Sequence, residues 1–296
     1  QKAWVDAVAK IPFGQYREFE GNITQGVDAS HAFLVRSRAI LDSATFGMEE
    51  MKARIIQMVG QLMVNPSTIG CTIGLKGEAG TGKTTIAMKG IAKIFNRPFC
   101  FLGLGGSMDA HLIEGQLSVF EGSTYGYIVS SLILTQCMNP IFFFDELDKL
   151  SDGHHGADVA NVLMKLTDSS QNQSFYDRYF PDIPLDLSRA LFIFSYNDES
   201  KVHPVLLHRM YKITANGYKV REKISIARLH LIPEIYANLK FAAEDVIFSD
   251  KILEYICTNH CEKEEGVRNF KRAIETIYAQ LNLYRLMHEG TSPAQL

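Results

Sequence analysis

The chain has 296 residues, 46% hydrophobic and 21% charged, which is enough for one large or two ordinary domains of a globular protein. The formal net charge of −3 provides no basic field for nucleic acid, and no apolar run approaches the ~20 residues of a membrane-spanning helix. The five cysteines are an odd number, which favours free thiols in a reducing compartment. The chain shows no signal-peptide pattern. Because it begins at Gln1 rather than Met, we expect a segment of a longer protein or a processed form.

Three helices are predicted before the first strand. A short helix near the N-terminus ends before Pro12, and an amphipathic helix covers about residues 29–43. A third helix runs from Met48 to Val64 and stops at Asn65-Pro66, because the residue before proline disfavours the helical region.

The next stretch, Gly77-Glu78-Ala79-Gly80-Thr81-Gly82-Lys83-Thr84, fits the phosphate-binding pattern G-x-x-x-x-G-K-[ST]. It lies between an apolar predicted strand at 71–75 and a predicted helix at 85–95, which is the context that the pattern requires. Glycines let the backbone curl around an anion, and a helix N-terminus adds partial positive charge. We predict that Lys83 contacts the β- and γ-phosphates of a nucleotide and that Thr84 binds Mg²⁺. The alternative is a glycine turn before an ordinary helix.

Two carboxylates, Asp145 and Glu146, directly follow the apolar run 141–144, which reads as a buried strand. In open α/β sheets the carboxyl ends of the strands face the ligand crevice. We therefore predict that Asp145 holds Mg²⁺ through water and that Glu146 polarises the attacking water as a general base. A second buried strand at 190–195 places Asn197 beside the same crevice. The alternative is a solvated strand end.

The remaining pattern predicts more of an α/β sheet and then a helical C-terminal part. Strands are predicted at 98–102 and 211–214, and helices at 127–137 and 158–167. The segment 115–126, rich in glycine and aromatic residues, is predicted to be a loop or a small hairpin, and 181–187 is predicted to be a polar loop. After Tyr218 no strand pattern occurs, and helices are predicted at 221–239, 249–261 and 267–287. The predicted domains are a helical linker segment at 1–47, a large α/β nucleotide-binding domain at 48–217 and a small helical lid at 218–296. Cys257, His260 and Cys261 offer three metal ligands on one helical turn, but we favour helix packing there.

Taken together, these motifs resemble the ATPase module of Lon proteases, within the AAA+ family, from Trp4 to about Met287. Phe144-Asp145-Glu146-Leu147-Asp148-Lys149 is close to the DEIDK of that family, and Gly266-Val267-Arg268 is similar to the GVR of its second sensor. Five further segments are similar to the family and occur in the same order along the chain as they do there, at 41–48, 103–106, 168–177, 186–188 and 217–223.

The resemblance implies a five-stranded parallel sheet sandwiched by helices, followed by the small all-α lid. It also implies a nucleotide site made of Gly77, Glu78, Ala79, Gly80, Thr81, Gly82, Lys83, Thr84 and Thr85, with Phe46 and Gly47 at its entry. Thr84 and Asp145 would hold the metal. Glu146 would be the catalytic Walker B residue, Asn197 the first sensor, Arg209 the arginine finger and Arg268 the second sensor. The family has Asp before the finger arginine, where this chain has His208.

The segment 115–123 resembles the pore loop of the family, in which Phe120 takes the place of a substrate-gripping tyrosine and Glu121 follows it. The alternative for Phe120 is burial against the sheet. The resemblance implies an ATP- and Mg²⁺-dependent ATPase that assembles as a hexameric ring or spiral and threads unfolded protein through its centre. A peptidase domain or partner would act with it, in the cytoplasm or in the mitochondrial matrix of a eukaryote. Neither a membrane nor nucleic acid is expected as a partner. The alternative function is an AAA+ ATPase that remodels nucleic acid or a protein complex without proteolysis.

Overall fold

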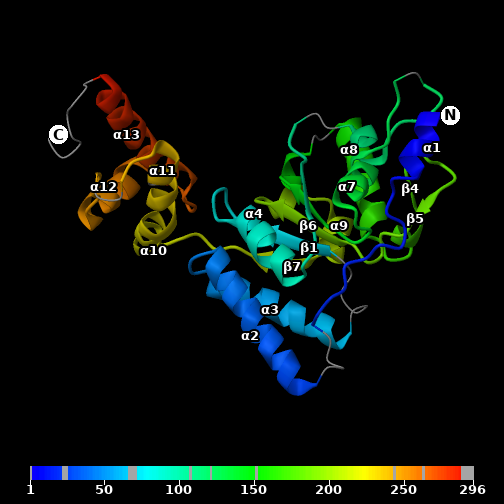
Figure 1. Cartoon of the computed structure of the whole chain (residues 1–296), viewed down its shortest axis with the longest axis horizontal. Helices are drawn as coiled ribbons and strands as arrows, with labels where there is room; N and C mark the ends of the chain where they lie inside the picture. The colour runs from blue at the N-terminus through cyan, green and yellow to red at the C-terminus, as the bar shows by residue number, and fades with distance from the viewer. Residues whose placement is uncertain are drawn as a thin grey trace. The chain divides into compact units, whose positions relative to one another are not determined.

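The computed structural model describes residues 2–21, 26–65, 72–106, 109–120, 122–150, 153–242, 245–261 and 264–287. The chain divides into two compact units (Figure 1). The larger unit contains the residues up to Gly77 together with Lys83–Ala215, and the smaller unit contains Glu78–Gly82 together with the residues from Asn216 onward. Five residues of the glycine loop therefore group with the C-terminal helices.

A five-stranded sheet forms the centre of the larger unit. Its strand order is β2 (Phe99–Gly103), β3 (Ile141–Asp145), β6 (Leu191–Tyr196), β1 (Thr72–Lys76) and β7 (Tyr211–Thr214). All neighbouring pairs are parallel. The central strands β3 and β6 are apolar on both faces because helices cover both sides of a parallel sheet. The predicted five-stranded parallel α/β fold is confirmed.

Alternating residues of the strands build two separate cores. On one face, Phe142, Phe144, Phe192 and Phe194 pack with α6 (Ala110–Glu114), α7 (Tyr127–Thr135) and α8 (His154–Thr167). On the other face, Ile73, Leu75, Phe143 and Ile193 pack with α2 (Val27–Ala44), α3 (Glu49–Val64) and the helix that follows the glycine loop. Figure 1 shows these two groups of helices on opposite sides of the sheet. The short helix α1 (Lys2–Val8) joins the first core, where the ring centroid of Trp4 lies 5.5 Å from that of Phe180.

The helix predicted after the glycine loop is present, but its middle is wound as a π-helix. It consists of α4 (Lys83–Thr85), the π-helix η2 (Ile86–Ile91) and α5 (Ala92–Ile94). Gly90 lets α2 approach closely, since a Cβ there would lie 2.9 Å from the side chain of Leu41. No local sequence signal accounts for the π-helical winding.

Shorter elements complete the larger unit. They are η3 (Leu147–Lys149), η4 (Asn172–Ser174), β4 (Phe175–Tyr176), β5 (Pro184–Leu185), η5 (Glu199–Lys201) and α9 (Pro204–Arg209). Two elements of the larger unit differ from the sequence prediction. The helix α8 begins at His154, four residues before the predicted start. The strand β5 lies in the segment 181–187, predicted to be a loop, and pairs with β4 as an antiparallel hairpin.

The smaller unit is helical over its described C-terminal residues. It contains α10 (Val220–Ile226), the π-helix η6 (Ala227–Leu231), α11 (Ile232–Leu239), α12 (Asp250–His260) and α13 (Arg268–Met287). Pro233 lacks an N–H and crowds the preceding turn, which gives a physical reason for the wider winding of η6 just before it. Phe241 and Phe248 pack around the buried ring of Tyr278, and Cys257 and Cys261 are buried. Among the described residues, no helix has the length and apolarity needed to cross a membrane.

Candidate nucleotide site

The carboxyl ends of β1 and β6 bring Lys83 and Asn197 together. Lys83 is the first residue of α4 and is only 8% exposed. Its Nζ donates to the carbonyl oxygen of Gly77, directly after β1, and to Oδ1 of Asn197, directly after β6, at 2.9 Å. A lysine buried to this extent needs such polar partners, because an unpaired buried charge is costly. The two residues predicted to contact the terminal phosphates therefore lie in hydrogen-bond contact.

The glycines of the loop stand where other residues would not fit. A Cβ at Gly77 would lie 2.5 Å from the carbonyl oxygen of Ala215, and the Gly77 amide donates to Tyr196 O at 3.1 Å. Gly80 and Gly82 have φ values of +79° and +87°, a region that L side chains rarely adopt. An anion-binding nest forms where right-handed and left-handed backbone conformations alternate, so that successive N–H groups point to one side. Thr84 and Thr85 follow in α4 and are half-buried.

Within the smaller unit, Arg268 lies against the middle of the glycine loop. The Val267 amide donates to Gly80 O at 3.2 Å, and a Cβ at Gly80 would lie 2.9 Å from the Arg268 nitrogen. The exposed Arg268 side chain lines a cavity of about 640 Å³, within the ~300–1,000 Å³ typical of small-molecule pockets. Its other lining residues are Glu78, Ala79, Asn259, His260, Cys261, Glu264, Glu265, Asn269 and Arg272. The described residues contain no group of three or more His, Cys, Asp or Glu arranged to hold a metal ion.

At the carboxyl end of β3, Asp145 and Glu146 share one hydroxyl of β6. The Ser195 Oγ donates to Asp145 Oδ1 and accepts from the Glu146 amide at 3.3 Å. Glu146 has φ +59°, an uncommon left-handed conformation for a residue other than glycine. Its exposed carboxylate lies beside Gly105, where a Cβ would be 2.5 Å from Glu146 Oε2. The chain thus holds Asp145 by a side-chain contact and leaves room for the Glu146 carboxylate.

Two residues of this site were missed by the sequence analysis. Ser195 occupies the end of an apolar run, where nothing local distinguishes it from any polar strand end. Asp148 is buried and accepts a hydrogen bond from the Asp198 amide at 3.1 Å, which ties the turn after β3 to the residue that follows Asn197. In the sequence, the only sign is that Asp148 lies shortly after a predicted strand; its burial, which requires a polar partner, is visible only in the structure.

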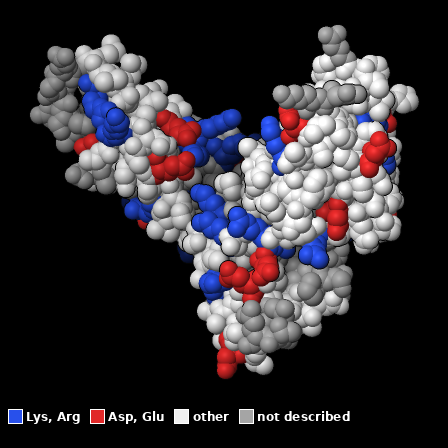
Figure 2. Space-filling view, turned by 45° about the vertical axis from the view of Figure 1, so that its right-hand side comes forward, with Lys and Arg blue, Asp and Glu red and all other residues white. Residues whose placement is uncertain are grey.

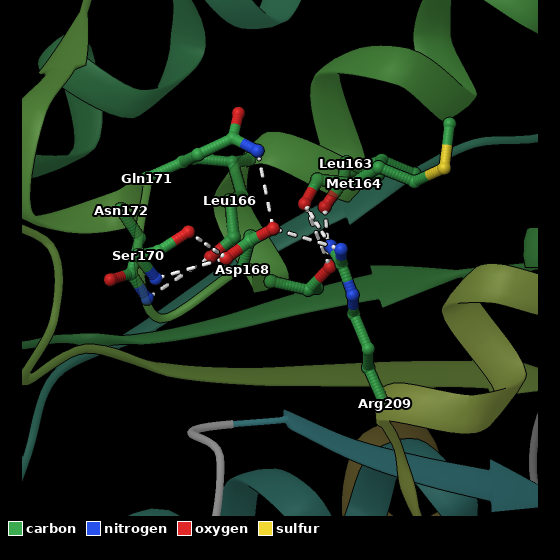
Figure 3. A network of polar contacts seen from close by, with 9 residues as sticks. Leu163, Met164, Leu166, Asp168, Ser170, Gln171, Asn172 and Arg209 are labelled. Carbon is green, nitrogen blue, oxygen red and sulfur yellow. Dashed lines mark hydrogen bonds and ion pairs between the residues drawn. The ribbon is translucent and has the colours of Figure 1, made fainter.

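Arg209, the last residue of α9, is held by its own chain (Figure 3). One terminal nitrogen donates to the carbonyl oxygen of Met164 at 2.7 Å, and the other pairs with Asp168 Oδ2 at 2.9 Å. The pKa of Asp168 lies below its usual range, mainly because the Ser170 hydroxyl and amide donate to it, with Arg209 and Gln171 contributing less. His208, where the resembled family has Asp, is exposed.

The loop between α6 and α7 exposes Phe120 by 65% and Val119 by 81%, so Phe120 is not packed against the sheet. Glu121 lies outside the described residues. The base of the loop is closed by Asp177, which accepts hydrogen bonds from the amides of Gly126 and Tyr179 at 2.8 Å each. Burial raises the pKa of Asp177 to about 6 in spite of these two amides.

Phe46 and Gly47 lie in the turn that joins α2 to α3. Phe46 is half-buried, and Gly47 and Met48 have φ values of +61° and +56°. This left-handed pair reverses the chain between the two helices. The predicted site residues of the larger unit thus come from the ends of β1, β3 and β6, from α4 and α9, from the turn after α2 and from the loop between α6 and α7.

Comparison with known proteins places this geometry in a family. The model of the ATPase family associated with various cellular activities (AAA) matches residues 73–218. The chain is 36% identical over 279 residues to a Lon protease homolog of Acanthamoeba polyphaga mimivirus. It is 32% identical over 274 residues to the mitochondrial Lon protease homolog of Homo sapiens. Each alignment covers 93% of this chain and 27% of the relative, so the chain spans about a quarter of the length of these proteins.

A solved structure of Hsp104 in its closed state, with ATPγS and FITC casein, has a similar fold. Its TM-score is 0.65 at 16% identity, and the match covers 88% of this chain and 49% of the Hsp104 chain. At this identity the likeness concerns the fold alone. The strand order, the glycine loop and the sequence relatives agree, and the chain therefore belongs to the AAA+ ATPases as a nucleotide-binding, Lon-like ATPase module.

Proposed function

We propose that this chain is the ATP-hydrolysing motor of a Lon-like ATP-dependent protease, which unfolds protein substrates and threads them through the pore of a ring of subunits. The observation that supports this most directly is the contact between Lys83 and Asn197 beside the Asp145–Ser195 pair. These four residues lie at the carboxyl ends of three neighbouring strands, which is where open α/β sheets bind ligands.

The residues fit ATP and Mg²⁺ as ligands. The ammonium of Lys83 would lie against the β- and γ-phosphates, and the glycine loop would offer amides to the phosphate oxygens. The Thr84 hydroxyl and the Asp145 carboxylate are the hard oxygen donors that Mg²⁺ prefers, the latter acting through water. When bound, Mg²⁺ would neutralise charge on the phosphate oxygens. Phe46 and Gly47 would border the nucleotide.

Glu146 and Asn197 would act on the attacking water. Glu146 would accept its proton as a general base, and the exposure of the carboxylate beside Gly105 leaves it accessible for that role. The Asn197 side chain would orient the water or the γ-phosphate, while its Oδ1 holds Lys83. Phosphoryl transfer depends mainly on positioning and charge stabilisation, so this division of roles requires little covalent chemistry from the protein.

Two arginines would complete the site. Arg209 would reach the nucleotide of a neighbouring subunit as an arginine finger, a contact that contributes roughly 10³–10⁵ in rate where it has been measured. Arg268 would respond to the nucleotide as the second sensor. Because the finger comes from a neighbour, hydrolysis would depend on assembly of a ring, for which we propose a hexamer.

The exposed aromatic Phe120, with Glu121 after it, would grip the threaded polypeptide. An aromatic ring on a loop can wedge between side chains without reading their sequence. Acidic and basic side chains are interspersed on the face shown in Figure 2, and the net charge is −3, which favours a protein substrate over nucleic acid. A peptidase domain or partner would cut the product, in the cytoplasm or, in a eukaryote, in the mitochondrial matrix.

Two substitutions test the proposal. Lys83→Ala should abolish binding of a fluorescent ATP analogue, whereas Lys89→Ala, an exposed lysine in η2, should not. Glu146→Gln should retain binding and lose turnover. Wild-type turnover should rise with an unfolded protein and not with DNA. Normal binding by the Lys83 variant would refute the site, and stimulation by DNA alone would favour a machine that acts on nucleic acid.

A further inference from the structure

The carboxylate of Asp168 is fixed by its own local chain, independently of Arg209. Asp168 caps the C-terminal end of α8, and its Oδ1 accepts from the Ser170 amide at 2.9 Å and from the Ser170 hydroxyl at 2.6 Å. Gln171 Nε2 donates to Oδ2 at 3.1 Å. The side chain is 19% exposed. Three contacts from the following turn thus set the direction of this carboxylate before Arg209 pairs with it (Figure 3).

The guanidinium of Arg209 is held on two sides. Besides the ion pair with Asp168, it donates to Met164 O in the last turn of α8, where the carbonyl groups carry the partial negative charge of a helix C-terminus. A guanidinium is planar, so two contacts through two different nitrogens fix its plane as well as its position. They use two of its five N–H donors, and the side chain remains 32% exposed.

The backbone that carries Arg209 is also well defined. Arg209 is the last residue of α9, and β7 begins two residues later and pairs with β1. The backbone of Arg209 is therefore anchored in α9, and its guanidinium is held at the C-terminal end of α8. His208, the preceding residue, is exposed and takes no part in this arrangement in any described contact.

We propose that Asp168 is a positioning residue, which together with the Met164 carbonyl sets the direction in which the Arg209 guanidinium faces a neighbouring subunit. The inference rests on the proposed function, in which Arg209 completes the neighbour's site. Asp168 supplies the local acidic support that position 208 lacks in this chain. If the pair only tied α8 to α9, its loss would lower stability and leave the turnover of folded protein unchanged.

The variant Asp168→Asn removes the negative charge of residue 168 and keeps the size and shape of its side chain. Asparagine keeps an acceptor oxygen for the Ser170 turn and loses the negative charge that Arg209 meets. The matched control is Asp186→Asn, because Asp186 Oδ1 likewise accepts the amide two residues on, from Ser188 at 2.9 Å. We expect kcat of the Asp168 variant to fall by about 10- to 100-fold, the scale of a small misplacement of a catalytic group. The affinity for ATP should change less than twofold, and the control should match wild type.

A double-mutant cycle shows whether Asp168 acts through Arg209. In an Arg209→Ala background, Asp168→Asn should reduce kcat no further, because the group that it positions is gone. A second readout needs no turnover: modification of Arg209 by phenylglyoxal, followed by mass spectrometry of the nucleotide-free chain, should be several-fold faster in the Asp168 variant. Asp168→Glu should recover part of the kcat, since it restores the charge.

The outcomes separate this proposal from the proposed function. Full turnover by Arg209→Ala would remove the finger itself. A slow Arg209→Ala variant with a normal Asp168→Asn variant, in both kcat and reagent reactivity, would overturn the positioning role alone. Faster turnover by Asp168→Asn would also overturn it, because the ion pair would then be restraining Arg209. If Asp168→Asn lowered kcat by the same factor with and without Arg209, Asp168 would act independently of Arg209, and the positioning role would be wrong.

Discussion

Removal of the Ser195 hydroxyl tests whether β6 orients the acidic pair at the end of β3. The Ser195 side chain is 1% exposed, and its Oγ is the donor to Asp145 Oδ1 and an acceptor for the Glu146 amide. Alanine removes both contacts and leaves only a one-atom gap. The Glu146 amide retains Asp145 Oδ1 at 3.2 Å, whereas Asp145 loses a buried donor.

The expected cost follows from the charge on that acceptor. A hydrogen bond to a charged group contributes about 1.5–3 kcal/mol, so we expect Ser195→Ala to lower the free energy of unfolding by about 2 kcal/mol. For a unit of this size, that corresponds to a fall in Tm of roughly 4–8 °C. Because both acidic residues lose a contact, kcat should fall about tenfold, or about 1.4 kcal/mol in activation free energy, while ATP still binds.

The chain offers both a probe and a control. Its single tryptophan, Trp4, lies in the larger unit with its Nε1 donating to Tyr179 O at 3.0 Å, so its fluorescence follows unfolding of that unit in urea. Ser37 is also 1% exposed, but its hydroxyl has no hydrogen-bond partner within the part of the chain that the structure describes. Ser37→Ala should therefore be neutral or slightly stabilising. Equal stabilities and equal kcat for the two variants would refute the reasoning.

Three further changes probe the other parts of the site. Phe120→Ala should leave ATP hydrolysis intact and stop unfolding of a tagged reporter protein; full unfolding would end the proposed grip. Gly105→Ala should displace the Glu146 carboxylate and lower kcat about tenfold without loss of ATP binding, measured by turnover and by titration. Asp177 has a folded pKa of about 6, above the unfolded value, so its ionisation costs stability as pH rises from about 4 to 7. In urea titrations, Asp177→Asn should therefore gain on wild type by up to roughly 3 kcal/mol across that range, and a pH-independent difference between the two would refute the shift.

The parts of the fold that could be predicted from the sequence are those that produce a pattern among neighbouring residues. The apolar runs before Asp145 and Asn197 are long enough to mark buried strands, and the glycine loop marks the strand before it and the helix after it. Parallel strands share one carboxyl edge, so the same patterns also place Lys83 near Asn197. The roles of these residues in catalysis, and the limits of the domains, stay predictions.

What sequence reasoning missed depends on contacts between distant residues. Asp145 and Ser195 are 50 positions apart, and Arg209 is 41 positions from Asp168. Neither pair has a periodicity or a spacing that could reveal it. The identity of residue 208 was a misleading clue to the support of Arg209, because a residue far along the chain provides the carboxylate.

The residues at the carboxyl end of β6 connect the otherwise separate parts of the site. Ser195 contacts Asp145, Asn197 contacts Lys83, and the Asp198 amide donates to Asp148. These partners lie at the end of β3 and in the segments that follow β3 and β1, the two neighbours of β6 in the sheet. A displacement of Lys83 by a bound phosphate would therefore act on Asn197 first, and through one short stretch of backbone on the contacts that hold both Asp145 and Asp148. The end of β6 thus connects Lys83, which we propose to bind phosphate, with the acidic pair through hydrogen bonds and one short stretch of backbone.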